Sequence, residues 1–150
     1  MSSATFRLND TNSNTFARFP VKNNISVTTI LSADGTTPKK ILEGSTTVLG
    51  SRISKILISS NDTSRVINLF LHNGTIISEL PFISFSIADG STNKVYSNIL
   101  NIPELSDIIE RDNNGNKFFM LDTNYSIYAS VDSSVTSLKT IQFSSWVEDY

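Results

Sequence analysis

Few residues of this 150-residue chain could carry catalytic or metal chemistry, because it has one histidine and no cysteine. The histidine, His72, ends a run of alternating residues just before Asn73-Gly74. A catalytic imidazole needs an orienting carboxylate and a nucleophile within reach, and the sequence around His72 identifies neither. We therefore predict a structural role for His72. The lack of cysteine excludes a disulfide framework, a thiol nucleophile and cysteine-ligated zinc or iron–sulfur sites.

Two acidic arrangements are the remaining candidates for site chemistry. Asp112-Asn113-Asn114-Gly115-Asn116 offers oxygen ligands of the kind that calcium prefers. It lacks the glycine at the sixth position and the closing glutamate of an EF-hand loop, so we predict a plain turn. A hydrolase would need an acid pair such as Asp122 with Glu79, and no recognised catalytic motif supports one. We predict that the protein is not an enzyme and has no cofactor and no metal site.

Charge and hydropathy argue against further classes of function. The chain has 12 Lys and Arg against 14 Asp and Glu, a formal net charge of −2. Because the basic residues are scattered, we predict no binding to nucleic acid or to an anionic membrane. No apolar run approaches the roughly 18 residues of a membrane helix, and residues 1–14 lack the apolar stretch of a signal peptide. We expect neither a membrane span nor secretion by the standard route, and one domain with a single core.

The elements that would position these residues are mostly strands. Asn, Ser and Thr make up 54 residues and Val, Ile and Thr make up 40, which favours turns and strands over helices. Alternating apolar and polar residues predict about eight short strands, separated by turn signals such as Asp34-Gly35 and Asn73-Gly74. The stretches with strand character cover residues 25–31, 46–59, 65–72, 75–80, 82–87, 95–100, 118–121, 125–131 and 140–147. They predict an all-β fold, an antiparallel β-sandwich or jelly roll.

Two segments depart from this pattern. Residues 103–111 (PELSDIIER) predict one short helix, with proline in its first turn, acids near its start and Arg111 near its end. Residues 1–24 sustain no period and predict an extended N-terminal arm, which leaves residues 25–150 as a single β-sandwich domain. Phe6, Phe16 and Phe19 lie in this arm. Two interpretations stay open, a frayed terminus or docking on the body or on a neighbouring chain.

A set of aromatic residues is predicted to face away from the core. If the aliphatic residues of three strands point inward, then Phe70, Tyr128 and Trp146 point to the outer side of their sheets. We predict that these three form one outward aromatic face, which favours a contact surface between chains; the alternative is that the arm, the short helix or a long loop covers them. The inward set is Ile67, Leu69, Leu71, Ile127, Ala129, Val131, Ile141, Phe143 and Val147.

Four stretches of the sequence resemble β-rich virion proteins. They are residues 52–75 (RISKILISSNDTSRVINLFLHNGT), IPEL at 102–105, residues 112–131 (DNNGNKFFMLDTNYSIYASV) and the ending KTIQFSSWVEDY at 139–150. Together they are similar to the auxiliary, or decoration, proteins that tailed bacteriophages add to the outside of an assembled head. The single positions that match are Arg65, Gly74, Pro103, Gly115-Asn116 and Asp149-Tyr150. The first 50 residues have no counterpart in this resemblance.

The resemblance implies a small β-sandwich capsid decoration protein. Such a protein is a non-enzymatic structural component of the virion, assembled in the host cytoplasm, that binds the major capsid protein on the capsid surface as a homo-oligomer. Another head protein or a fibre is a further candidate partner. Interface residues are then expected among Phe6, Phe16, Phe19, Phe70, Tyr128 and Trp146. The alternative is a carbohydrate- or host-binding β module of a phage fibre or tail, in which Trp146 or Tyr128 would stack on a sugar ring.

Overall fold

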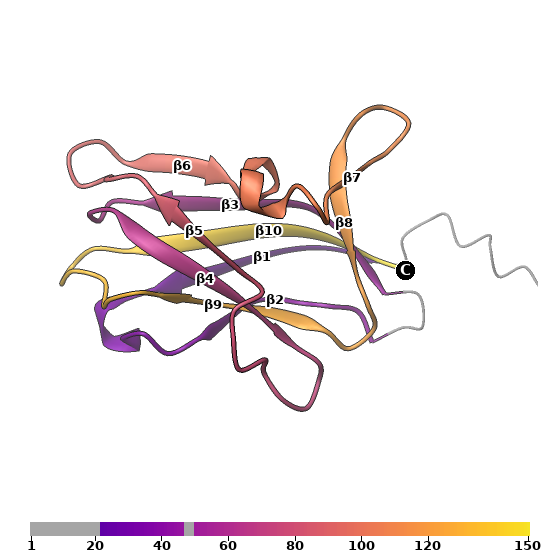
Figure 1. Ribbon diagram of the computed structural model, residues 1–150, viewed down its shortest axis with the longest axis horizontal. Helices are drawn as coiled ribbons and strands as arrows, with labels where there is room; N and C mark the ends of the chain where they lie inside the picture. The colour runs from indigo at the N-terminus through magenta and orange to yellow at the C-terminus, as the bar shows by residue number, and fades with distance from the viewer. Residues whose placement is uncertain (1–21, 47–49) are drawn as a thin grey trace, which may run out of the picture.

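A computed structural model describes residues 22–46 and 50–150 of the protein, which form antiparallel strands in two stacked sheets (Figure 1). This part of the chain contains ten strands and three short 3₁₀ turns. The strands are β1 (Lys22–Ile30), β2 (Lys39–Glu43), β3 (Ser51–Ser60), β4 (Arg65–His72), β5 (Ile83–Ile87), β6 (Val95–Asn98), β7 (Glu110–Arg111), β8 (Lys117–Leu121), β9 (Ser126–Val131) and β10 (Ile141–Asp149). The 3₁₀ turns are η2 (Ser32–Asp34), η3 (Ile99–Asn101) and η4 (Pro103–Leu105).

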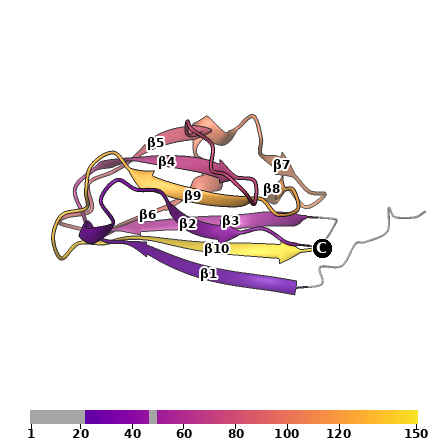
Figure 2. The ribbon, with the colours of Figure 1, turned by 90° about the horizontal axis from the view of Figure 1, so that it is seen from below.

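The two sheets have different strand orders. The six-stranded sheet runs β1-β10-β3-β8-β7, and β6 also pairs with β3. The four-stranded sheet runs β2-β9-β4-β5. Figure 2 shows the layer of β3, β10 and β1 beneath the layer of β5, β4 and β9. The predicted all-β, antiparallel sandwich is confirmed, and the jelly-roll alternative stays a prediction.

The core lies between the sheets because successive side chains of a strand point alternately into the interior and toward solvent. β10 places every second residue in the interior, from Ile141 through Phe143 to Asp149. The inward set predicted from the sequence is buried, apart from Leu71, which is half-buried and packs against the core. Each large aliphatic or aromatic side chain that is buried in this way stabilises the fold by about 1.5–3 kcal/mol relative to an exposed position.

A buried carboxylate ties together the loops at one end of the sandwich. Asp62, in the β3–β4 turn, pairs with the Arg65 guanidinium at 3.0 Å and accepts hydrogen bonds from the backbone N–H groups of Thr63 and Thr136. Burial by itself raises the pKa of Asp62. The hydrogen bonds from Thr136 and Thr63 and the charge of Arg65 outweigh that effect and hold the pKa below its ordinary value. The β3–β4 turn therefore also anchors the β9–β10 loop.

A second carboxylate ties three strands at the opposite end. Asp149 of β10 is buried, accepts a hydrogen bond from the Ser51 hydroxyl of β3 (2.8 Å) and another from the Asn24 amide of β1 (3.0 Å). These bonds satisfy both carboxylate oxygens, as a buried polar group requires. They fix the end of β10 between β1 and β3.

The predicted helix over residues 103–111 is wrong. Only η4, Pro103–Leu105, is helical there, as a single 3₁₀ turn, and Glu110–Arg111 form strand β7. Nine residues are too few to hold a helix by propensity alone, and only Leu105 among the η4 residues is buried. Pairing of Arg111 with Lys117 of β8 takes the end of the segment into the sheet.

The predicted strand over residues 75–80 is also wrong. The segment makes one isolated bridge, between Ile77 and His72. The side-chain carbonyl of Asn73 accepts the backbone N–H groups of Thr75 and Ile76, which removes two donors that a strand ladder would use. β4 pairs instead with β5, which begins at Ile83.

The predicted arm differs from the structure at its C-terminal boundary. Residues 22–24 belong to β1, where Asn24 pairs with Val147 of β10. Alternation from Ile25 onward was visible in the sequence, but the pairing partner that extends the strand back to Lys22 was not. Phe6, Phe16 and Phe19 lie outside the described residues.

Candidate functional site

Strand register arranges the outer side chains of the six-stranded sheet in rows. β1 pairs with β10 and β10 with β3, so Ile25, Trp146 and Lys55 lie side by side across three strands. Met120 of β8 lies opposite Arg52 of β3 in the next row. We call this outer surface the β10 face; its residues include Ile25, Val27, Arg52, Lys55, Tyr96, Met120 and Trp146.

The β10 face presents large apolar side chains to solvent. Ile25 is 66% exposed, Val27 59%, Tyr96 73% and Met120 46%. The other large apolar residues of the described chain that are exposed lie outside the strands: Leu31, Ile76, Leu80, Ile108 and Leu138. Exposed apolar residues that share one surface are typical of contact sites between proteins.

A groove of about 790 Å³ opens on the β10 face where β6 and β8 meet the same side of β3. β6 pairs with residues 57–60 and β8 with residues 51–53, so neither strand covers the residues between. A bulge opposite Trp146 inserts Ser54, whose hydroxyl donates to the Trp146 carbonyl at 3.3 Å. The bulge and the two strand ends together leave room for the groove, with Trp146 among its lining residues.

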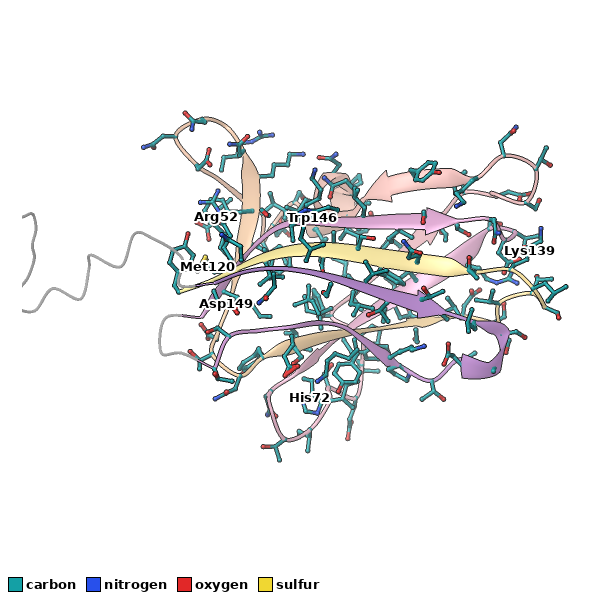
Figure 3. The ribbon with its side chains drawn as sticks, turned by 180° about the vertical axis from the view of Figure 1, so that it is seen from behind. Arg52, His72, Met120, Lys139, Trp146 and Asp149 are labelled. Atoms are coloured by element: carbon teal, nitrogen blue, oxygen red, sulfur yellow. The ribbon has the colours of Figure 1, made fainter. Side chains whose placement is uncertain are left out.

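Arg52 is the most densely contacted charge in the groove. Its guanidinium pairs with Asp112 at 2.9 Å and lies 4.2 Å above the ring centroid of Phe118. Its Nε lies 3.6 Å from a carboxylate oxygen of Glu148. Figure 3 shows Arg52 near the end of the sheet where Asp149 and Met120 lie, with Trp146 further along the same sheet.

The carboxylate of Asp112 organises the neighbouring β7–β8 turn. It accepts the backbone N–H groups of Asn114 and Asn116, which fold the turn around it. The hydrogen bond from the Asn116 backbone and then the Arg52 guanidinium lower the pKa of Asp112 to about 2. The structure has a turn at residues 112–116, as predicted, and the lowered pKa keeps the Asp112 carboxylate charged at neutral pH.

Three more cations line the groove, and neutral groups hold each of them. The Lys55 ammonium lies 5.1 Å from the ring centroid of Trp146. Arg111 donates to the Gly115 carbonyl at 2.9 Å, and Lys117 to the side-chain oxygen of Asn101 at 2.9 Å. The ion pairs of the described residues include none of these three cations.

The outer surface of the four-stranded sheet, which we call the β9 face, has a different character. Its residues include Lys40, Asn68, Phe70, His72, Ser84 and Tyr128. Phe70 and Tyr128 are cross-strand partners, and the His72 ring stacks on Tyr128 with centroids 5.2 Å apart. His72 Nδ1 also accepts the backbone N–H of Gly74 at 3.1 Å. These contacts fit the predicted structural role of His72.

A smaller polar cavity of about 360 Å³ lies at the edge of the β9 face. His72, Tyr128, Glu43 and two asparagines, Asn73 and Asn124, are among its lining residues. One aromatic ring, one carboxylate and amide groups are side chains that bind sugar hydroxyls in general. This cavity is the place in the described chain where the alternative sugar-binding function has suitable chemistry.

The prediction that the outward aromatic residues form one surface is wrong. Phe70 and Tyr128 lie on the β9 face and Trp146 on the β10 face, on opposite sides of the sandwich. Alternation along a strand fixes whether a side chain points in or out, but not the sheet that the strand joins. All three are half-buried.

Sequence reasoning missed the charged groove. Arg52, Lys55, Arg111 and Lys117 come from three strands, and the sequence shows them as scattered charges. The alternation of β3 placed Lys55 on an outer face, and that was the available signal. Asp122 and Glu79, the candidate acid pair of a hydrolase, are both exposed, and neither lines one of the two cavities described above.

Comparisons with known proteins give no relative. No protein-family model matches the chain, and no curated protein or solved structure is significantly similar to it. Within residues 22–46 and 50–150, no cluster of three or more His, Asp or Glu side chains could hold a metal ion. No helix in the same ranges has the length and apolar character of a membrane span.

Proposed function

We propose that this protein is a non-enzymatic structural protein of a tailed-phage virion, an auxiliary head protein that binds the major capsid protein through the β10 face. The observation that carries the proposal is the exposure of Ile25, Val27, Tyr96 and Met120 on one sheet surface. Covering an exposed side chain of this size at an interface contributes about 1.5–3 kcal/mol before the costs of association. The resemblance of residues 52–150 to decoration proteins supplies the virion context.

The free edge of β1 supports self-association in the same proposal. β1 is nine residues long and ends the six-stranded sheet, and no described strand pairs with its outer edge. A long edge strand with exposed Ile25 and Val27 offers backbone groups to a strand of another chain. The proposed assembly is therefore a homo-oligomer on the capsid, with the predicted arm and its Phe6, Phe16 and Phe19 as additional contacts.

Co-expression with the major capsid protein encoded in the same genome tests the proposal. The full chain should sediment with capsid shells in a sucrose gradient. Ile25→Asp/Val27→Asp, which places two charges on the β10 face, should remove it from the shell fraction. The matched control is Ser84→Asp/Ser86→Asp, two exposed positions of the edge strand β5 in the other sheet.

Circular dichroism of each double variant keeps the result interpretable. Both should retain the β spectrum and unfold within a few degrees of the unsubstituted chain, because all four positions are exposed. Absence of the unsubstituted chain from the shells would contradict the capsid proposal. Equal loss for both double variants would contradict the role of the β10 face.

A carbohydrate-binding module of a fibre or tail is the second candidate, and the cavity beside His72 and Tyr128 favours it. A glycan array separates the two functions. Glycan binding that Tyr128→Ala abolishes, together with no sedimentation with shells, would replace the first proposal by the second.

A further inference from the structure

The groove on the β10 face concentrates positive charge on a chain whose formal net charge is −2. Four of its lining residues are cations, Arg52, Lys55, Arg111 and Lys117, and one is an acid, Glu148. Asp112, which contacts Arg52 from the β7–β8 turn, adds a second carboxylate. Both carboxylates lie against Arg52, so the charges of the other three cations are not neutralised by ion pairs within the described residues.

The neutral partners of these cations keep their charges available to a ligand. A lysine over an aromatic ring retains its full positive charge and its hydrogen-bond donors. The same holds for Lys117, which bonds an amide oxygen of Asn101, and for Arg111, which bonds a backbone carbonyl. Three cations from β3, β7 and β8 therefore surround one open groove, and a carboxylate-bearing ligand would complete their pairing.

The placement of the cations favours a peptide over a sugar as that ligand. Lys55 lies over the ring of Trp146, and Arg111 and Lys117 line the same groove from two further strands. Recognition in this groove therefore depends on charge, and an extended peptide can present several carboxylates to cations on neighbouring strands.

We propose that the groove lined by Lys55, Arg111, Lys117 and Trp146 binds an acidic, extended segment of a partner protein. The inference deepens the proposed function, since the groove lies on the β10 face, and it names the chemistry that the partner must bring there. Carboxylates of the segment pair with the three cations, and Trp146 packs against its side chains. The groove of about 790 Å³ accommodates a few residues of such a segment.

Trp146 allows direct measurement, because it is the single tryptophan of the chain. The probe is acetylated hexaglutamate, titrated into the full chain at low salt while Trp146 emission is recorded and the heat of binding is measured by calorimetry. Hexaglutamate should bind and change the emission, since carboxylates draw the Lys55 ammonium away from the ring. Acetylated hexaglutamine should not bind. Affinity should fall steeply as salt approaches 0.15 M, where screening acts over about 8 Å.

Two charge reversals locate the binding. Lys117→Glu in the groove should weaken hexaglutamate binding by about tenfold or more. Lys139→Glu is the matched control, the same change at the opposite end of the sandwich (Figure 3), and should alter affinity less than about twofold. Both variants should keep the circular dichroism spectrum and unfolding midpoint of the unsubstituted chain, because neither residue belongs to the buried core.

The outcomes separate this inference from the capsid proposal. No heat and no emission change with hexaglutamate, or equal weakening by both charge reversals, would overturn the groove assignment even if the chain sediments with shells. Tighter binding of an acidic oligosaccharide, hexagalacturonate, than of hexaglutamate would assign the groove to a glycan instead. If hexaglutamate binds as expected but no shells bind, the capsid proposal fails and the groove assignment stands.

Discussion

The two outer faces of the sandwich differ in how their aromatic residues are covered. On the β10 face, Trp146 lies between exposed Ile25 and the long side chain of Lys55, beside a charged groove. On the β9 face, Tyr128 is stacked by His72 and paired with Phe70, and no large aliphatic side chain of that face is strongly exposed. The exposed neighbour of Trp146 is a reason that we propose the β10 face, and not the β9 face, as the contact surface.

The largest effect is expected at Asp62, which serves both faces because it ties the loops that join the sheets. Asp62→Ala leaves the Arg65 guanidinium and two backbone N–H groups without their buried partner, and should cost about 3–5 kcal/mol of unfolding free energy. Asp112→Ala should cost less, because the side chains of Arg52 and Asp112 are 24% and 23% exposed, whereas that of Asp62 is 1% exposed. Urea unfolding of both variants measures the difference, and an equal loss would show that the groove pair is also structural.

The next effect tests the comparison of the faces directly. Trp146→Ala should weaken binding to capsid shells by about 30-fold, which corresponds to the roughly 2 kcal/mol of a central interface tryptophan. Tyr128→Ala should leave shell binding unchanged and cost about 0.5–1.5 kcal/mol of stability through the lost stack with His72. Sedimentation and urea unfolding give the two readouts. Loss of folding in Trp146→Ala would place that residue in the core, contrary to its half-buried position.

The sequence predicted the fold class better than it predicted the faces. Period-two alternation identified the core sides of β4, β9 and β10 because burial of one face imposes it on each strand separately. The grouping of strands into sheets depends on pairing between distant residues, such as Ile25 with Trp146, and alternation contains no information about it. For this reason Phe70, Tyr128 and Trp146 were predicted on one surface and are found on two.

Short sequence signals predicted turns correctly, but they failed where strand pairing between separate segments determined the local structure. Asn73-Gly74 is one of the turn signals of the sequence, and Gly74 has a positive φ of 94° in the structure. Residues 103–111 met the end rules of a helix, but β8 recruits Arg111 into strand pairing. The groove was invisible to sequence reasoning because its cations meet only after β3, β7 and β8 pair.

Substitution of two glycines with positive φ, Gly74 beside the β9 face and Gly115 beside the groove, compares the turns at which they lie. Gly74→Val should cost about 1–2 kcal/mol from the backbone alone, plus a contact penalty, because an added Cβ would lie 3.3 Å from the Asn124 carbonyl. Gly115→Val, in the turn beside the groove, has φ 82° and open space around the position, so only the backbone cost applies. Urea unfolding should rank Gly74→Val as the less stable variant. The reverse order would mean that the β7–β8 turn is the more constrained of the two.

The smallest expected effect is a change in the pKa of Asp112, beside the groove. The pKa of Asp112 is lowered to about 2 in the folded protein from an ordinary 3.8, so its contribution to stability is complete above the ordinary value and is lost as the pH falls toward 2. Arg52→Met should raise this pKa only part of the way back, because the backbone N–H of Asn116 is the larger cause and remains in place. Side-chain carbon chemical shifts of Asp112, followed by NMR from pH 6 to pH 1.5, measure both values. A pKa unchanged by Arg52→Met would show that Arg52 does not pair with Asp112 in solution. Arg52 would then keep only one carboxylate contact, with Glu148, and would differ less from the other cations of the groove.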